Sequence, residues 1–531
     1  MRGEGGTSGD PGSQTPTLSR RRFVRNAAVG GAIAGSGVGA SLLQALPAQA
    51  AGPAATFLPP DNDLHLLRRA TWGPTPDLHH QIRKMGMDRW LDQQLKPNSI
   101  DDRYCNDLIS TRFPRLKWTL RDAYLNHSDE GWDLMRDLGV AAIVRAAWSK
   151  RQLLEVLVDF WSNHLNIANF GDSVWWSRHD YDRAVIRRHA LGKFSDMLAA
   201  SATHPAMMMY LNNAESTKDN PNENYGRELL ELHTVGVDGG YSEAEMRTSA
   251  LILTGLGVHY YDSVNDGTFS YNFENHYTGH VKVLGWSSNN KSAKQGIDVA
   301  LDYVDYLAHH RATAHRISYK LCQRFLSDKP PAGLVTKMAD AYRAHDTAII
   351  PVLRVLFDSK TFRQSKGTKV IRPMQDVVAT VRILGIKPGA NDGDDGLSSL
   401  YWLIEGLSDA PLAWVQPNGY PDYADAWRSA GGTLNRWNAH LDLATGYGDL
   451  QVPDPRKALL PTKLPKDHGE LIQVLAERLV FRKLSQGHRN ALLAFLGRSA
   501  ADPVNSSSEA VGWRLPYLAA LILDSPYHGI R

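Results

Sequence analysis

The stretch that decides how this chain folds is Asn222-Glu223-Asn224-Tyr225-Gly226-Arg227-Glu228-Leu229-Leu230-Glu231-Leu232-His233-Thr234. Placed on a helix at ~100° per residue, it separates into two arcs. The polar arc holds Glu223, Asn224, Arg227, Glu228, Glu231 and Thr234. The apolar arc holds Tyr225, Leu229, Leu230, Leu232 and His233. The pattern predicts a helix that buries one side, and we interpret its crowded polar side as a functional site.

A second helix begins almost at once. Gly236-Val237-Asp238-Gly239-Gly240 ends the first helix, and Ser242 with Glu245 has the spacing of a capping box. Helical periodicity also dominates most of the chain from residue 64 onwards, with a long central helix expected over 132–166. No repeat of 20–50 residues is visible, which disfavours a solenoid.

Residues 257–286 depart from this helical pattern. Aromatic and β-branched residues flank Asn265-Asp266-Gly267, which is typical of a hairpin around an Asp-Gly turn, and residues 281–284 are expected to add a strand. The predicted fold is mainly α: a large multi-helix single body with a small β-hairpin insertion near residues 257–286. Residues 51–531 are expected to form one domain.

Residues 1–50 have the pattern of a twin-arginine signal peptide. Ser19-Arg20-Arg21-Arg22-Phe23 precedes a weakly hydrophobic run, and Ala48-Gln49-Ala50 supplies small residues for cleavage. The alternative, a membrane anchor, is disfavoured because the run is glycine-rich and only marginally long enough to span a bilayer. The sequence therefore predicts export, to the cell envelope or the medium.

Removing this leader changes the charge balance. The leader carries Arg2, Arg20, Arg21, Arg22 and Arg25 against Glu4 and Asp10, which accounts for the whole formal charge of +3. The remaining ~480 residues are close to neutral, so no polycationic surface for nucleic acid is expected. No later apolar stretch is long enough to span a membrane, so no stable membrane span is expected after cleavage.

The two cysteines, Cys105 and Cys322, offer no CxxC or haem-attachment motif. Cys322 lies on the apolar side of an expected helix. Two buried, unpaired thiols are therefore favoured over a single disulfide, which an exported protein would also permit.

Two histidines are expected to point into the interior. His164 ends Asp159-Phe160-Trp161-Ser162-Asn163-His164, and His233 occupies the same kind of position on the 222–234 helix. Each is either a hydrogen-bonded core histidine or a group that does chemistry. In the chemical interpretation His164, Glu228 and His233 bind a divalent transition metal, although no HExxH motif supports this.

The carboxylates of the 222–234 helix also have two interpretations. As catalytic groups, Glu228 or Glu231 acts as general acid or base together with His164, and Arg227 binds an anionic group. As structural groups, Glu223–Arg227 and Arg227–Glu231 are i,i+4 ion pairs that form an internal ladder tying this helix to its neighbours.

Further polar residues complete the candidate site. The predicted substrate-binding residues are Asn224, Glu223, His204, His276, Asn418 and Tyr420. The last two belong to Gln416-Pro417-Asn418-Gly419-Tyr420-Pro421, a rigid loop with aromatic neighbours. Such a loop either lines a site for a sugar or another planar substrate or packs against a helix end. Walker, GxSxG and Rossmann motifs are missing, which disfavours nucleotide binding and serine hydrolysis.

Several of these stretches together resemble the bacterial domain-of-unknown-function 1800 family. The resemblance rests on His65-Leu66-Leu67-Arg68-Arg69-Ala70-Thr71-Trp72-Gly73-Pro74, Asp159–His164, His204-Pro205-Ala206-Met207, the 222–240 segment, Lys320-Leu321-Cys322, Lys369 with Arg372-Pro373, and 416–421. It implies secretion, a mostly helical fold and the company of a secreted phosphatase-like sister family. It brings no established reaction. The chain departs from the family pattern at Leu256, Tyr277 and Val281.

The sequence thus leaves three functions open. The first is an extracytoplasmic, hydrolase-like enzyme with a metal or acid–base centre on the 222–234 helix. The second is a noncatalytic binding or assembly protein of the envelope, whose polar helix is a structural, buried ion-pair network. The third, a cofactor-dependent oxidoreductase, is favoured only by the export route.

Overall fold

The computed structural model describes residues 61–126, 131–170, 174–260, 265–389 and 395–531. The predicted twin-arginine leader at residues 1–50 lies outside these described residues, so its export function stays a prediction.

The described chain is mainly helical, as predicted. It begins with α3 (Asn62–Ala70), α4 (Pro76–Met85), α5 (Met87–Gln94), α6 (Arg103–Arg112), α7 (Leu120–Asn126), α8 (Trp132–Trp148) and α9 (Gln152–His164). It continues with α10 (Arg178–Tyr181), a π-helical stretch (Asp182–Arg187), α11 (Phe194–Ala202), α12 (Pro205–Tyr210), α13 (Glu223–Glu228), a second π-helical stretch (Leu229–His233) and α14 (Glu243–Ile252). The strands are β1 (Leu256–Val258), β2 (Phe269–Tyr271), β3 (Val281–Val283) and β4 (Trp286–Ser288).

Helices resume after the strands. They are α15 (Gly296–His309), α16 (Arg311–Phe325), α17 (Ala332–Ala344), α18 (Ile349–Phe357), α19 (Lys360–Gln364), α20 (Pro373–Leu384) and α21 (Asp395–Glu405). The last are α22 (Ala430–Thr445), α23 (Pro455–Leu459), α24 (His468–Val480), α25 (Gln486–Leu496), α26 (Leu515–Leu523) and α27 (Pro526–Gly529).

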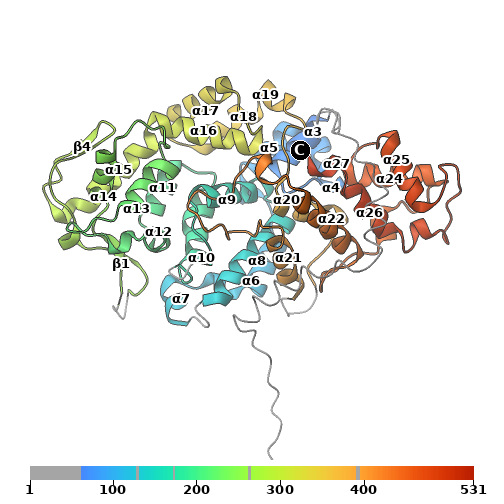
Figure 1. Ribbon diagram of the computed structural model, residues 1–531, viewed down its shortest axis with the longest axis horizontal. Coiled ribbons are helices and arrows are strands. Elements are labelled where there is room, and N and C mark those ends of the chain that lie inside the picture. The colour runs from blue at the N-terminus through green and yellow to red at the C-terminus, as the bar shows by residue number, and fades with distance from the viewer. Residues whose placement is uncertain (1–60, 127–130, 171–173, 261–264, 390–394) are drawn as a thin grey trace, which may run out of the picture.

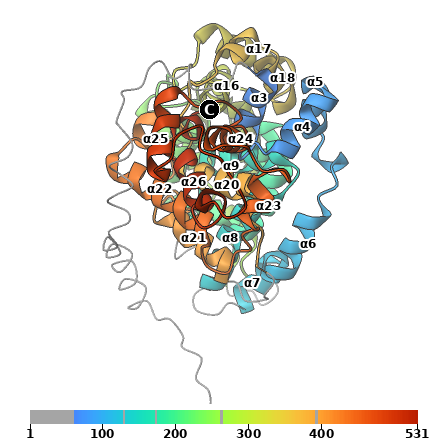
Figure 2. The same ribbon diagram turned by 90° about the vertical axis from the view of Figure 1, so that its right-hand side faces the viewer.

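The molecule is elongated, with α9 near its middle (Figure 1). Helices α11–α15 and the strands form one end, and α22 with α24–α26 forms the other. The N-terminal helices α3–α5 lie beside α18, and α3 lies close to the C-terminus (Figure 2). A continuous cluster of buried apolar side chains runs from Leu66 to Tyr527 and passes through both ends. Burial of this cluster is the main force that holds the helices together.

The β insertion consists of two separate hairpins. Strands β1 and β2 pair antiparallel on either side of the expected turn, where Thr268 N–H donates to the Asn265 carbonyl. Residues 281–284 do not add to this sheet, because β3 pairs with β4 instead. Leu284 and Gly285 both have positive φ, at 51° and 91°, which makes the two-residue turn of a tight hairpin.

The long helix expected over 132–166 is two helices. The break after α8 is stabilised by Asp102, a buried carboxylate that accepts hydrogen bonds from Ser149 Oγ at 2.7 Å and from Lys150 N–H at 2.7 Å. Side-chain to backbone bonds of this kind compete with helical hydrogen bonds. Because α9 therefore starts afresh at Gln152, its direction is independent of that of α8, and α9 lies near the middle of the molecule.

The 222–234 helix is α-helical only as far as Glu228. A capping Asn222 begins it, and the backbone widens into a π-helix over Leu229–His233. The wider turn rotates the end of the segment, so that Thr234, placed by the α-helical wheel on the polar arc, is buried and donates to the Leu229 carbonyl at 2.6 Å. Gly226 lets α13 lie directly on α14, because a Cβ there would approach Ala250 N to 2.6 Å. The predicted capping box of α14 is present.

Two smaller predictions concern membranes and thiols. In the part of the chain that the structure describes, no helix has the length and apolar character to cross a membrane. Cys105 and Cys322 are both buried and unbonded to each other, as the sequence favoured. Cys322 Sγ instead contacts Met338 Sδ at 3.2 Å.

Candidate functional site

A cavity of about 340 Å³, which we name the α9 cavity, lies beside the C-terminal turns of α9. Its wall residues come from α9, from α16, from Arg372 just before α20, and from the loop of residues 414–423. In Figure 1 α9 lies with α16 on one side and α20 on the other. Segments that are far apart in the sequence, such as those of Asp159 and Arg372, therefore line one space.

The 414–423 loop is fastened directly to the end of α9. Asn166 Nδ2 donates to the carbonyls of Trp414 and Gln416, at 2.9 and 2.7 Å. Gly419 adopts a φ of +69°, and a Cβ at this position would lie 2.0 Å from the Asn163 carbonyl oxygen. Only glycine fits such an approach. Gly419 is thus required for the 414–423 loop to lie against the end of α9.

Lys320 and His164 form a hydrogen-bonded pair in the cavity wall, which we name the Lys320–His164 pair. His164 Nε2 lies 3.0 Å from the His233 carbonyl, and because a carbonyl only accepts, Nε2 carries the ring proton. The lone pair of His164 Nδ1 is then free to accept from Lys320 Nζ, at 3.0 Å. The π-helical end of the 222–234 segment supplies the carbonyl that fixes this tautomer.

The pair is electrostatically unusual. Burial, together with Lys320 and Arg316, holds the pKa of His164 well below its ordinary value, so the ring is neutral. Burial and the nearby Arg316 lower the pKa of Lys320 to about 7. Arg316 stays in place because its Nε and Nη2 both donate to the Leu232 carbonyl at 3.3 Å. An amine with such a pKa exchanges protons readily at neutral pH.

A network of charged side chains forms part of the cavity wall. Arg372 donates to Asp159 at 3.2 Å and to Asp409 at 2.5 Å. Arg324 contacts Asp159 at 3.2 Å and Asp422 at 3.7 Å. We name these five residues the arginine–aspartate network. Arg324, Arg372 and Lys320 line the cavity together with Asp159 and Asp422. The lining therefore has one more basic than acidic side chain, which favours an anionic group as the bound species.

Aromatic side chains form the opposite surface. The rings of Trp414 and Tyr420 lie 5.0 Å apart, and Trp414 Nε1 donates to Asn418 Oδ1 at 2.8 Å. Arg372 stacks over the Tyr420 ring at 5.1 Å, which ties the aromatic surface to the arginine–aspartate network. Of the residues predicted from the sequence, His164, Asn418 and Tyr420 line this cavity.

The polar face of the 222–234 segment does not line the cavity. Arg227 lies 3.7 Å from Glu223, 3.6 Å from Glu231 and 3.2 Å from Glu243 of α14, and all of these side chains are at least a quarter exposed. The ion pairs of the structural interpretation are therefore present, but the expectation that they form a buried ladder is wrong, because they lie on the surface.

The two remaining polar residues of that segment lie apart from the ladder's ion pairs. Partial burial and the charge of Glu231 raise the pKa of Glu228. Asn224 is exposed, and its side chain donates weakly to the Leu211 carbonyl at 3.4 Å.

The predicted metal ligands His164, Glu228 and His233 are not gathered around one point. Both ring nitrogens of His164 already have partners. The His233 ring is fully buried with neither nitrogen hydrogen-bonded, and burial lowers its pKa to about 3. Among the described residues, the set of three histidine, cysteine or acidic side chains with donor atoms within 4.8 Å of one another is Asp376, His440 and His528.

His204 and His276 are both engaged elsewhere. His204 Nδ1 accepts from the Ala206 N–H at the start of α12, and its Nε2 lies 3.2 Å from Asp180. The His276 ring bridges the Thr254 carbonyl and the Asn290 side chain, at 2.8 and 3.1 Å. Both rings are buried and neither lines the α9 cavity.

Sequence reasoning missed Lys320, Arg324, Arg372 and Asp422 as site residues. Lys320 and Arg372 stand in two of the stretches that carry the family resemblance, so a signal was present. Those stretches do not by themselves mark a site, because neither residue sits in a pattern with a known chemical role. Their common location became apparent only when α16 and the start of α20 were placed beside α9.

Comparison with known families identifies the family of the chain. The model of the family described as "Protein of unknown function (DUF1800)" matches residues 65–528, so the chain belongs to this family. Comparison with curated proteins and with solved structures returned no match.

Proposed function

We propose that this member of the DUF1800 family is an exported hydrolase that uses Lys320 as its acid–base group in the α9 cavity. The observation that supports the proposal is the 3.0 Å hydrogen bond between Lys320 Nζ and the neutral His164 ring, in the wall of a cavity of about 340 Å³. This proposal replaces the acid–base groups expected from the sequence, Glu228 or Glu231, with Lys320.

The chemistry depends on the protonation state of the amine. Neutral Lys320 takes a proton from a water molecule, and the resulting hydroxide attacks the electrophilic centre of the substrate. The ammonium form of Lys320 then returns this proton to the leaving group as the bond to that group breaks. Arg324 and Arg372 stabilise the negative charge that develops on the attacked group. His164 accepts one N–H of Lys320 and keeps the amine oriented throughout.

The walls of the cavity define the class of substrate. The guanidinium groups of Arg324 and Arg372 favour a molecule with an acidic group. Trp414, Tyr420 and Tyr423 offer ring faces to a flat or ring-shaped body, such as a sugar unit. We therefore propose a small, acidic, ring-containing substrate that the protein meets outside the cytoplasm.

The first experiment measures the reactivity of Lys320 and needs no substrate. The folded full chain is labelled with an amine-acylating reagent between pH 6 and 10, and labelling is followed site by site by mass spectrometry. We expect Lys320 to label half-maximally near pH 7, far below the exposed Lys337, which serves as the internal reference. Coinciding profiles for the two lysines would refute the proposal.

The second experiment measures turnover. Chromogenic esters, phosphoesters and glycosides that carry an acidic group are tested with the wild-type chain, Lys320→Met and the control Lys337→Met. We expect Lys320→Met to lose ~10²–10⁴-fold in rate, the usual contribution of a general acid–base group, and Lys337→Met to lose none. Equal rates for Lys320→Met and wild type on every substrate that is turned over would contradict the assignment.

A noncatalytic binding protein of the envelope is the second candidate. It is favoured by the arginine–aspartate network, because the same arginines could bind an anionic solute that undergoes no reaction. Saturable binding of an acidic sugar without turnover, together with ordinary Lys320 reactivity, would support it. The secreted phosphatase-like sister family remains the proposed partner under either function.

A further inference from the structure

We propose that Asp376, His440 and His528 form a binding site for one divalent transition-metal ion, with Zn²⁺ as the fitting example. The three side chains come from α20, α22 and α27, and they expose only 3%, 4% and 9% of their surface. The site is separate from the α9 cavity and from the residues that the sequence predicted as metal ligands.

The donor atoms converge on one point. His440 Nε2 and His528 Nε2 each lie 3.2 Å from the same oxygen, Asp376 Oδ1. The two ring planes stand at 82° to each other with centroids 5.4 Å apart, so the nitrogens approach from different directions. Ligand bonds of 2.0–2.1 Å in a tetrahedral complex place neighbouring donors roughly 3.4 Å apart. The observed separations are therefore close to those that a bound ion requires.

The surroundings orient the ligands as metal sites usually do. His440 Nδ1 lies 2.8 Å from Asp524 Oδ1, and this carboxylate fixes the tautomer that leaves Nε2 free for a metal. The second oxygen of Asp376 is 3.5 Å from Arg436, so Oδ1 remains the oxygen available to an ion. The site also has basic neighbours, because Arg436 faces Asp376 and the charge of Arg68 acts on His528.

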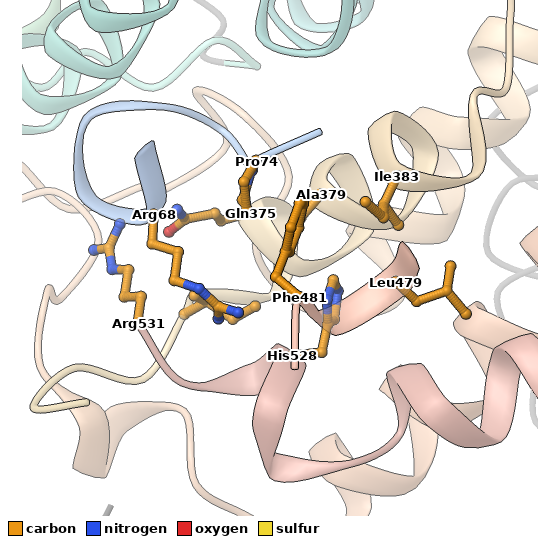
Figure 3. Close-up of a pocket in the computed structure, with 11 residues that line it drawn as sticks. Arg68, Pro74, Gln375, Ala379, Ile383, Leu479, Phe481, His528 and Arg531 are labelled. Carbon is orange, nitrogen blue, oxygen red and sulfur yellow. The ribbon is translucent and has the colours of Figure 1, made fainter. Parts of the chain in front are cut away.

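There is also space near the third ligand. His528 lines a second cavity, of about 30 Å³, together with Gln375 and Ala379 of α20 (Figure 3). This volume is enough for about two water molecules. Two imidazoles and one carboxylate leave a coordination position open in a four-coordinate ion, which a water can occupy.

The test uses the full chain, freed of metal by a chelator and shown to be folded by its melting curve. Co²⁺ is titrated in and followed by its visible absorption, and Zn²⁺ binding is measured by equilibrium dialysis. We expect one equivalent of either ion and the strong bands of four-coordinate Co²⁺. His440→Gln and His528→Gln should each weaken binding by ~100-fold or more, and Asp524→Asn by ~10–100-fold.

The matched control is His488→Gln. His488 packs on Tyr527, the residue before His528, but lies outside the three-residue set. It should bind metal like the wild type. A folded wild-type chain that takes up no Co²⁺ or Zn²⁺ would overturn the site and leave a protonated His440 between two carboxylates. The same conclusion would hold if the affinity of His440→Gln and His528→Gln equalled that of the control.

Discussion

The polar face of α13 and the α9 cavity contain the same kinds of residues in opposite surroundings. On α13, Arg227 and its partner Glu243 expose 37% and 60% of their side chains. In the cavity wall, Arg372 and its partner Asp409 expose 5% and 0%. Exposed ion pairs contribute little to the free energy of unfolding and leave the pKa values of their groups close to the ordinary ones. Breaking a buried ion pair strongly destabilises the fold, and burial shifts the pKa values of its groups. The sequence therefore draws attention to α13, where charged residues are dense. The charged groups of the cavity wall differ from those of α13 because they are buried away from water.

The arginines and the lysine of the cavity wall also differ in their partners. Arg324 and Arg372 are buried with carboxylates as partners. Lys320 lies in the same wall, but its close partner is a neutral ring, so burial acts on its charge without full compensation. That difference leaves the two arginines as fixed charges and makes Lys320 the cation that exchanges protons.

The largest effect is expected from Arg372→Met. The change leaves Asp159 and Asp409 without their guanidinium partner in a buried place, which typically destabilises by about 3–5 kcal/mol. Urea unfolding measures the loss. The control Arg247→Met removes an exposed pair with Glu223 and should lose less than ~1 kcal/mol. Equal losses of unfolding free energy in the two variants would show that ion pairs of the cavity wall and of the α13 face contribute equally to stability.

A smaller effect is expected from pH on Lys320. Its folded pKa of about 7 lies below the ~10.4 of a free lysine, so the unfolded chain binds more protons between these values. Stability that depends on Lys320 therefore rises from pH 7 towards 9, by roughly 2 kcal/mol or less because the Lys320 side chain as a whole is only half-buried and water screens part of its charge. Comparing urea unfolding of wild type and Lys320→Met across this range isolates the contribution. Parallel pH profiles would mean that Lys320 titrates normally.

Gly419→Ala tests whether the loop shapes the cavity. The left-handed backbone at this position disfavours alanine by about 1–2 kcal/mol, and the new Cβ would press against the Asn163 carbonyl. We expect the 414–423 loop to move and the reactivity of Lys320 to shift towards that of Lys337. Gly431→Ala, in a place with nothing within 4 Å of the added Cβ, is the control. Unchanged labelling of Lys320 in Gly419→Ala would show that the position of the 414–423 loop does not control the reactivity of Lys320.

The smallest effect is expected from Arg227→Ala. It removes three partly exposed ion pairs, so we expect a loss of about 0.3–1 kcal/mol in low salt that shrinks at high salt. Urea unfolding at two ionic strengths measures this. A loss as large as that of Arg372→Met would make the α13 face a major source of stability.

Sequence patterns predicted local structure well where the cause was local. The helical periodicity, the Ser242 and Glu245 capping box and the hairpin at Asn265–Gly267 each depend on neighbours within a few residues. The patterns failed where a distant residue intervened. Asp102 stabilises the end of α8 through Ser149, 47 residues away, and the π-helical turn at Leu229–His233 rotates Thr234 into the interior.

For the candidate site, the sequence alone determined that His164, Asn418 and Tyr420 belong to unusual polar stretches, and that α13 has a charged face. Only the tertiary structure decided that the end of α9, one face of α16 and the 414–423 loop enclose a space, and that α13 stays outside it. It also brought Asp376, His440 and His528 together from three helices. The physical reason is that a residue's chemistry depends on how much water and which charges surround it, and these are supplied by segments that no local pattern can connect.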